Sequence, residues 1–217
     1  MGNRNRTSDE HIVDKVLLVK LIKLAQGKGR LVTIPLHKLT FLSEKQMNDK
    51  GLKGFNYTFF RDFFGPAAPE IYGDFGELIG AGLIRDCPFR LTSSGEELLE
   101  GLEAAMRRNG NRSIVEIIEE VTRKNSIETK ALKEKVYKME IKLPNGSTMR
   151  VSDIPYQPDN KILMMNKIPA GSSRRTFSLE DGEVETFEVM MDAELRESLK
   201  KAEDDARGGR ITLRPPA

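Results

Sequence analysis

Few residues in this 217-residue chain carry the side chains that catalysis or metal binding requires. The histidines, His11 and His37, each lie beside apolar positions with helical spacing and lack a second ligand at metal spacing. The single cysteine, Cys87, has neither a CxxC partner for zinc nor a base that the sequence places nearby. The segment 26–30, Gln-Gly-Lys-Gly-Arg, lacks P-loop spacing. We therefore predict no catalytic residue, metal site or cofactor, and expect a protein that is not an enzyme.

Basic side chains offer several candidate contacts with nucleic acid, because DNA affinity comes mainly from neutralising phosphates. The candidates on a short ribbon are Arg85 and Arg90, and those near the first helix are Arg4, Arg6, Lys15, Lys20, Lys23, Lys28 and Arg30. A later helix adds Lys130, Lys133, Lys135 and Lys138. Scattered lysines that serve only solubility are the alternative interpretation.

Acidic and aromatic residues suggest a protein partner instead. Glu70, Asp74 and Glu77 stand at i, i+4 and i+7 of the predicted third helix, and an outward carboxylate stripe would repel phosphates. Either DNA meets another surface or this helix meets a protein; an ordinary solvated face is the alternative. A cluster of phenylalanines is close by, and its candidate partner-binding members are Phe60, Phe63 and Phe64. Core packing would also explain the cluster, but one short segment cannot turn every ring toward one core.

Apolar spacing predicts the elements that position these residues. Helices are expected over 10–26, 35–48, about 66–81, 93–108, 113–125, 126–138 and 192–206. Strands are expected over 30–33, 55–64, 83–85, 89–92, 141–143, 149–151, 161–165, 176–179, 184–191 and 211–213. Gly82 after the third helix, then a ribbon with its tip at 86–88, then a helix capped by Thr92 or Ser93, is the order of elements in a winged helix.

The domain organisation follows from a change in character near residue 140, where helical spacing gives way to turns such as Asn145-Gly146. We expect a flexible N-terminus over 1–9, a winged-helix domain with a helical extension over 10–140, and a small β-rich or mixed accessory module over 141–217. The predicted fold class is α+β.

Composition sets wider bounds. Hydrophobic residues make up 38% and charged residues 31%, a balance typical of a soluble globular chain. No apolar run approaches the roughly 20 residues of a membrane span. One cysteine fits a reducing compartment, so we expect a cytoplasmic protein without membrane contact. The net charge of +2 is far from the strongly basic balance of most nucleic-acid binders.

The chain resembles the YwgA-like and Panacea (SocA-like antitoxin) group of winged-helix proteins over roughly residues 12–138. The residues that carry the resemblance are 38–42 (Lys-Leu-Thr-Phe-Leu), Tyr57, Gly65, Pro66, Pro69, Tyr72, Gly82, Leu83, Ile84, Leu91, Thr92 and Gly95. The Gly-Leu-Ile…Leu-Thr-x-x-Gly part occurs in many winged-helix families. Phe-Gly-Pro-x-x-Pro-x-Ile-Tyr is more specific to this group. The resemblance implies prokaryotic regulation, toxin–antitoxin pairing or a role in defence genes.

The sequence thus predicts a prokaryotic winged-helix regulator or antitoxin-like factor that binds DNA, a partner protein, or both. The partner would be a toxin or an assembly subunit, and a homodimer is one expected state. The alternative is a protein-interaction subunit of a larger assembly, for example one related to defence, in which the winged helix no longer binds DNA. The acidic third helix favours this alternative, whereas the family resemblance favours the regulator.

Overall fold

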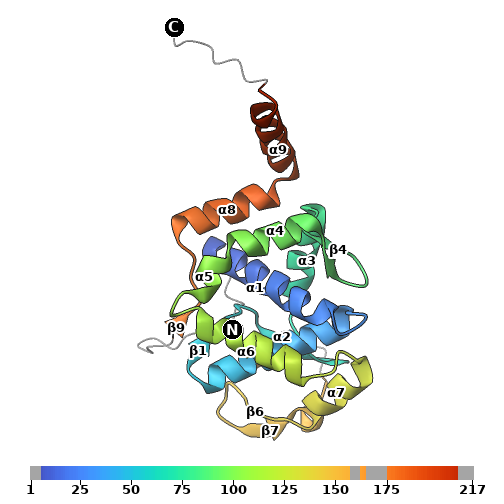
Figure 1. The fold of residues 1–217 in the computed structure, drawn as a ribbon. Coiled ribbons are helices and arrows are strands. Elements are labelled where there is room, and N and C mark those ends of the chain that lie inside the picture. Colours follow the sequence, from blue (N-terminus) through green and yellow to red (C-terminus); the bar gives the residue numbers. More distant parts are fainter. Residues whose placement is uncertain (1–5, 157–161, 165–174, 210–217) are drawn as a thin grey trace.

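The computed structural model describes residues 6–156, 162–164 and 175–209 and has a mixed α+β fold in which helices predominate (Figure 1). The helices are α1 Ser8–Gln26, α2 Thr33–Asp49, α3 Glu70–Gly80, α4 Ser93–Gly101, α5 Glu103–Arg107, α6 Arg112–Lys124, α7 Thr129–Tyr137, α8 Asp181–Met191 and α9 Ala193–Arg207. The strands are β1 Leu52–Lys53, β2 Phe59–Asp62, β3 Gly65–Ala67, β4 Ile84–Arg85, β5 Arg90–Leu91, β6 Glu140–Lys142, β7 Thr148–Arg150, β8 Ile162–Met164 and β9 Arg175–Thr176. The expected α+β class is confirmed. Within the described residues, none of these helices combines the length and apolar character needed to span a bilayer.

Helix α1 is the centre of the core. It packs against α2, α3, α4, α6, α8 and β5. Its apolar residues from Val16 to Ile22 are fully buried around the whole helix, as expected for a helix enclosed by others. Thr7 and Glu10 form a capping box at its start, with Glu10 N donating to Thr7 Oγ1 and Thr7 N donating to Glu10. The expected flexible segment 1–9 is therefore wrong for its last residues, since Arg6 is also held by two buried carboxylates.

The segment 55–64 does not form one strand as expected, because side chains satisfy its first backbone donors. Phe55 N donates to Glu44 Oε2 at 2.9 Å, and Asn56 N donates to Asp14 Oδ1. Strand pairing begins only at Phe59, where β2 joins β3 on one side and β8 on the other. The predicted strand 30–33 is also wrong: residues 30–32 join none of the described sheets and α2 begins at Thr33, although Leu31 O accepts a hydrogen bond from Phe89 N.

The expected boundary near residue 140 does not coincide with a break in packing. Strand β8 pairs antiparallel with β2, and β9 pairs parallel with β1, so late residues complete sheets that early residues begin. Helix α8 lies across α4 in Figure 1 and contacts α1. Among the described strands of the region after 139, the pair that forms within this region is the β6–β7 hairpin, with Gly146 at positive φ in its turn.

The predicted strand 184–191 is a helix, α8. Its inward residues, Val184, Phe187 and Met191, recur with helical rather than alternating spacing, and Glu180 with Glu183 forms a capping box at its start. The predicted helix 93–108 is interrupted at Leu102 into α4 and α5. The predicted strand 211–213 lies outside the described residues.

Candidate nucleic-acid interface

A single threonine fixes the β4–β5 hairpin against the helix that follows it. Thr92 Oγ1 accepts a hydrogen bond from Gly95 N at 3.1 Å and donates to Gly82 O at 2.7 Å. Thr92 N also donates to Leu83 O. Position 95 must be glycine, because a Cβ there would collide with the Leu83 carbonyl oxygen. The Leu-Thr-x-x-Gly pattern therefore encodes the close packing of α4 on this hairpin.

The hairpin presents two arginines side by side. Arg85 and Arg90 are cross-strand partners in the β4–β5 register, and both are exposed. In the described part of the chain neither has an ion-pair partner. The backbone at Arg30 lies close to that at Arg90, because Leu31 O accepts a hydrogen bond from Phe89 N at 2.9 Å. Of the predicted nucleic-acid contacts, Arg85 and Arg90 thus stand opposite each other on the hairpin, and the chain at Arg30 runs beside it.

The predicted lysines near the first helix have partners within the molecule. Lys20 Nζ lies 3.0 Å from Glu119, and Lys23 pairs with Glu96. Lys28 donates to the backbone carbonyls of Thr122 and Arg123, at 2.6 and 3.0 Å, and so caps the end of α6. These three lysines stabilise helix contacts and do not form the expected basic surface with the hairpin arginines.

The expected acidic stripe on α3 is wrong at its centre. Asp74 is 1% exposed and points inward, where it accepts hydrogen bonds from Tyr57 Oη at 2.6 Å and from Arg6 Nη1 at 2.7 Å. Glu77 remains exposed but pairs with Lys15. Glu70 is half-buried, and one of its carboxylate oxygens is enclosed. The face that α3 turns outward therefore carries little free negative charge.

Arg6 joins two buried carboxylates. Its guanidinium contacts Asp14 at 2.8 Å as well as Asp74, and it lies 5.1 Å from the centre of the Tyr57 ring. Burial opposes the charged form of Arg6, but the hydrogen bonds to Asp74 and Asp14 outweigh it and raise the pKa. Burial raises the pKa of Asp14 and of Tyr57 well above their usual values. This cluster of Arg6, Asp14, Tyr57 and Asp74 holds the N-terminus of α1 against α3.

Glycine makes up most of the outward face of α3. Gly73, Gly76 and Gly80 are exposed, and a Cβ at any of the three would meet nothing within 4 Å. Tyr72, 57% exposed, lies on the same face. Sequence reasoning overlooked this face, although three glycines inside one predicted helix are a recognisable signal because each weakens the helix.

The phenylalanine cluster divides between core and surface. Phe59 is fully buried and Phe60 is half-buried, whereas Phe63 and Phe64, in the β2–β3 turn, are 65% and 44% exposed. Exposed Tyr156 lies next to Phe63, with ring centres 6.2 Å apart. Tyr156 carries no sequence signal, because only the tertiary fold brings it to the turn.

Two neighbouring residues of α2 are buried behind this turn. Burial lowers the pKa of His37 to about 3, and its Nδ1 accepts a hydrogen bond from Ala68 N at 3.3 Å. Burial also lowers the pKa of Lys38 to about 7; its Nζ donates to Pro66 O at 2.7 Å. His37 is therefore a neutral core residue at physiological pH.

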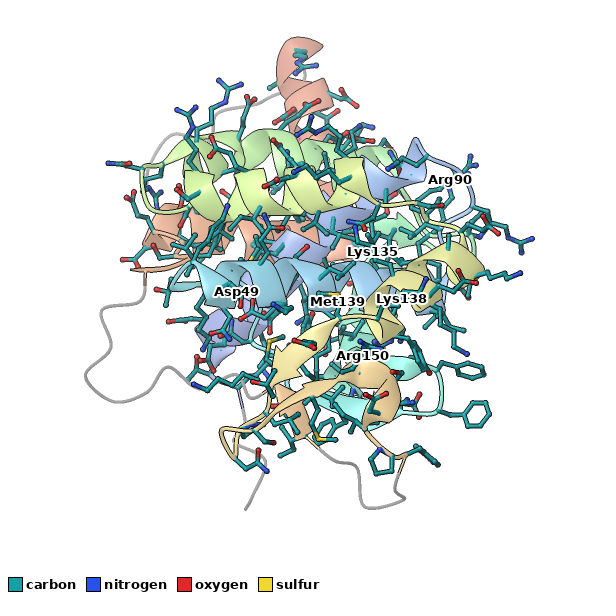
Figure 2. The ribbon with its side chains drawn as sticks, turned by 90° about the horizontal axis from the view of Figure 1, so that it is seen from below. Asp49, Arg90, Lys135, Lys138, Met139 and Arg150 are labelled. Carbon is teal, nitrogen blue, oxygen red and sulfur yellow. The ribbon has the colours of Figure 1, made fainter. Side chains whose placement is uncertain are left out.

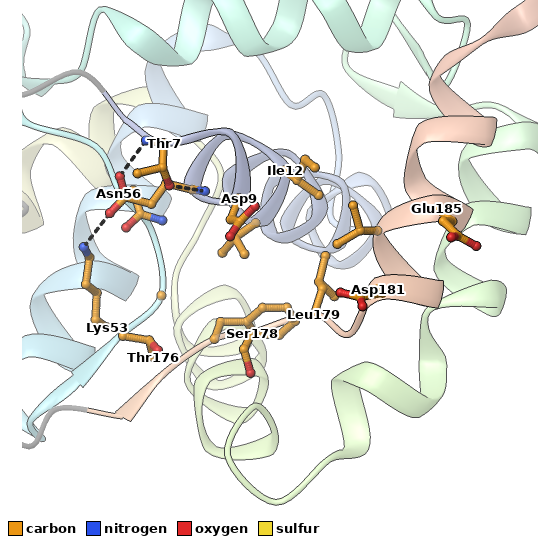
Figure 3. Close-up of a pocket in the computed structure, with 15 residues that line it drawn as sticks. Thr7, Asp9, Ile12, Lys53, Asn56, Thr176, Ser178, Leu179, Asp181 and Glu185 are labelled. Carbon is orange, nitrogen blue, oxygen red and sulfur yellow. Dashed lines mark hydrogen bonds and ion pairs between the residues drawn. The ribbon is translucent and has the colours of Figure 1, made fainter.

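A cavity of about 530 Å³ lies where the start of α1 meets the segment leading into α8 (Figure 3). Carboxylates of Asp9, Asp181 and Glu185 line it together with apolar Leu179. Lys53 Nζ, at its wall, is 3.5 Å from Glu10. The walls combine residues from both sides of position 140, so the cavity could not be predicted from either segment alone.

No protein-family model, curated protein or solved structure matches this chain. The resemblance to the YwgA-like and Panacea group therefore remains a prediction. Any functional interpretation depends on the geometry of the arginine hairpin, α3 and the exposed aromatic turn.

Proposed function

We propose that this chain is a winged-helix protein that binds double-stranded DNA, with β4–β5 as the wing and the outer face of α3 against the duplex. It would act as a prokaryotic regulator or antitoxin-like factor. The observation that carries the proposal is the pair Arg85 and Arg90, exposed and without an ion-pair partner in the described residues. Like charges directly opposite across a hairpin are destabilising, and a phosphate backbone would neutralise them.

The glycine face of α3 supports the same assignment. Each glycine in a helix interior costs about 1 kcal/mol relative to alanine. Neighbouring side chains do not require these glycines, since an added methyl group at positions 73, 76 and 80 would be in open space. A face without side chains allows a ligand backbone to approach the helix closely. With Asp74 buried and Glu77 paired, the electrostatic objection to DNA at this helix is much reduced.

A salt titration with charge-reversed variants tests the proposal. The probe is a fluorescently labelled, mixed-sequence duplex of about 30 base pairs, three helical turns. We expect the wild type to bind at low salt and Arg85→Glu with Arg90→Glu to weaken binding by about tenfold or more, with a shallower salt dependence. Fluorescence anisotropy measures both quantities.

The matched control reverses the charge of two exposed lysines of α9. This variant, Lys200→Glu with Lys201→Glu, changes the net charge by the same amount. If both double variants weaken binding equally, the effect is one of overall charge and the wing is not the contact. Absence of duplex binding by the wild type at low salt would overturn the proposal.

A protein-interaction subunit is the second candidate, and α9 favours it. This helix projects outward from α8 in Figure 1, with Arg196 near its start donating to Ala81 O at 2.7 Å, and it has no buried residue. Leu195 and Leu199 are 41% and 47% exposed, and Ala202 and Ala206 continue their stripe at spacings typical of helix pairing. Under this candidate, Leu195→Asp with Leu199→Asp abolishes co-purification of a partner from source cells, whereas the wing variant retains it.

A further inference from the structure

Three aromatic rings are exposed at the β2–β3 turn, two from the turn itself and one from Tyr156 beside it. Phe63, Phe64 and Tyr156 are between 44% and 65% exposed. The Phe63 and Phe64 rings lie edge to face with centres 5.0 Å apart, and Phe63 meets Tyr156 in the same manner. Contiguous exposed apolar surface on a soluble protein commonly marks a binding site.

Side chains of α2 and α7 fix the backbone of the β2–β3 turn. Buried Lys38 donates to Pro66 O, and Tyr137 Oη donates to Phe63 O at 3.2 Å. Gly65 has φ +94°, and a Cβ there would lie 3.0 Å from the Tyr137 ring, so Tyr137 packs directly on the backbone of the turn. The rings are therefore presented by a pre-organised hairpin, which lowers the entropic cost of binding.

A lysine lies over one of these rings, in a segment that is rich in cations. Lys133 Nζ lies 5.4 Å from the centre of the Phe64 ring and 5.3 Å from that of Tyr137. The buried Arg61 guanidinium also lies over the Tyr137 ring, at 5.0 Å. Residues 129–150 contain six Lys or Arg and two Glu, a net charge of +4. The cations of this segment are Lys130, Lys133, Lys135, Lys138, Lys142 and Arg150. In the described part of the chain, these six make no ion pair with a carboxylate.

We propose that this aromatic–basic surface, formed by Phe63, Phe64, Tyr156 and the cations of α7, binds single-stranded nucleic acid. Unpaired bases stack on exposed rings while lysines contact the phosphates. A duplex hides its base faces, so the rings would contribute little to duplex binding. In Figure 2, Lys138 and Arg150 lie apart from Arg90 on the wing, and Figure 1 shows α7 well below β4. The surface is thus separate from the proposed duplex site.

Two other ligands fit the observations less well. A membrane would have to receive the Phe64 ring together with the Lys133 ammonium that lies over it, and charge is costly to bury in hydrocarbon. Lysine is depleted in protein–protein interfaces, whereas this surface is rich in it. Phosphate with unpaired bases is the chemistry that uses both the rings and the cations.

Anisotropy titrations with labelled oligothymidylate of about 20 nucleotides test the inference, because this probe cannot form a duplex. We expect Phe63→Leu with Phe64→Leu to weaken binding by about tenfold or more, since leucine is apolar but cannot stack as a ring does. Phe63→Tyr with Phe64→Tyr should bind within about twofold of the wild type, because tyrosine keeps the stacking face. Circular dichroism confirms that each exposed-site variant is folded.

Failure of the wild type to bind oligothymidylate at low salt would overturn the inference, as would wild-type affinity in the leucine variant. Co-sedimentation with phosphatidylserine vesicles, in a protein that does not bind the oligonucleotide, would assign the surface to membranes instead. The wing variant Arg85→Glu with Arg90→Glu should retain oligothymidylate binding. This result would distinguish the two proposals, because duplex binding at the wing and single-strand binding at the aromatic–basic surface can each hold without the other.

Discussion

The protein buries charge in two different ways. Asp74 and Asp14 both form an ion pair with the guanidinium of Arg6, and Asp74 also accepts a hydrogen bond from the Tyr57 hydroxyl. Lys38, equally buried, donates to the carbonyl oxygen of Pro66 and has no ion-pair partner among the described residues. The first site therefore contains a counter-charge, whereas Lys38 lacks one and burial brings its pKa to about 7. The two sites differ in the presence of a counter-charge and not in the depth of burial.

The largest expected effect comes from removing the shared carboxylate. Asp74→Ala leaves the Tyr57 hydroxyl buried without its acceptor and takes one of two anions from Arg6, so we expect a loss of about 3 kcal/mol in the free energy of unfolding. Urea denaturation followed by circular dichroism measures it. Tyr57→Phe, which removes only the hydroxyl, should cost about 1 kcal/mol. Equal stability of Asp74→Ala and the wild type would show that the cluster contributes nothing to the fold.

Lys38 should make the folded protein more stable as the pH rises. A base that gains an acidic partner on folding would do the opposite. Below about pH 7 it is charged in both states, and the full cost of burying that charge is present. Between about 7 and its ordinary value of 10.5 the unfolded chain holds a proton that the folded chain has released, so stability rises with pH. From pH 7 to pH 9 we expect the wild type to gain about 2 kcal/mol relative to Lys38→Met.

The measurement is a series of urea denaturation curves for both proteins across that pH range. Lys38→Met keeps the length of the side chain and removes the titrating group, so changes elsewhere in the molecule cancel in the difference. Parallel pH profiles for the two proteins would mean that Lys38 keeps its proton in the folded state. Burial without a counter-charge would then not lower its pKa.

The smallest effect is expected on the outer face of α3, opposite Asp74. Gly76→Ala introduces a methyl group into open space, so it should stabilise the fold by about 1 kcal/mol. If the outer face contacts DNA, the same variant should weaken duplex binding in the anisotropy assay while the protein becomes more stable. A destabilised Gly76→Ala protein would contradict the contrast between the two faces of this helix.

Local features were the most predictable part of the molecule. The β4–β5 hairpin and the helix after it follow from Gly82, Thr92 and Gly95, whose conformations and caps depend on close neighbours in the chain. The assignments that failed depend on distant partners. Asp74 has a helical position that is compatible with an outward face, and only contact with Arg6, 68 residues away, makes it a core residue. Likewise Phe55 and Asn56 have strand-like residue types, but carboxylates of α1 and α2 take up their backbone donors.

The sequence by itself determined the α+β class, most helices and the hairpin with Arg85 and Arg90, because spacing, caps and turns act over a few residues. The tertiary structure alone decided which charges are free. It paired Lys20 and Lys23 with glutamates, buried Asp74, and gathered Tyr156 and Lys133 around Phe63 and Phe64. The free energy of a charged or aromatic side chain depends on what surrounds it in space, and that environment is assembled from segments far apart in the chain.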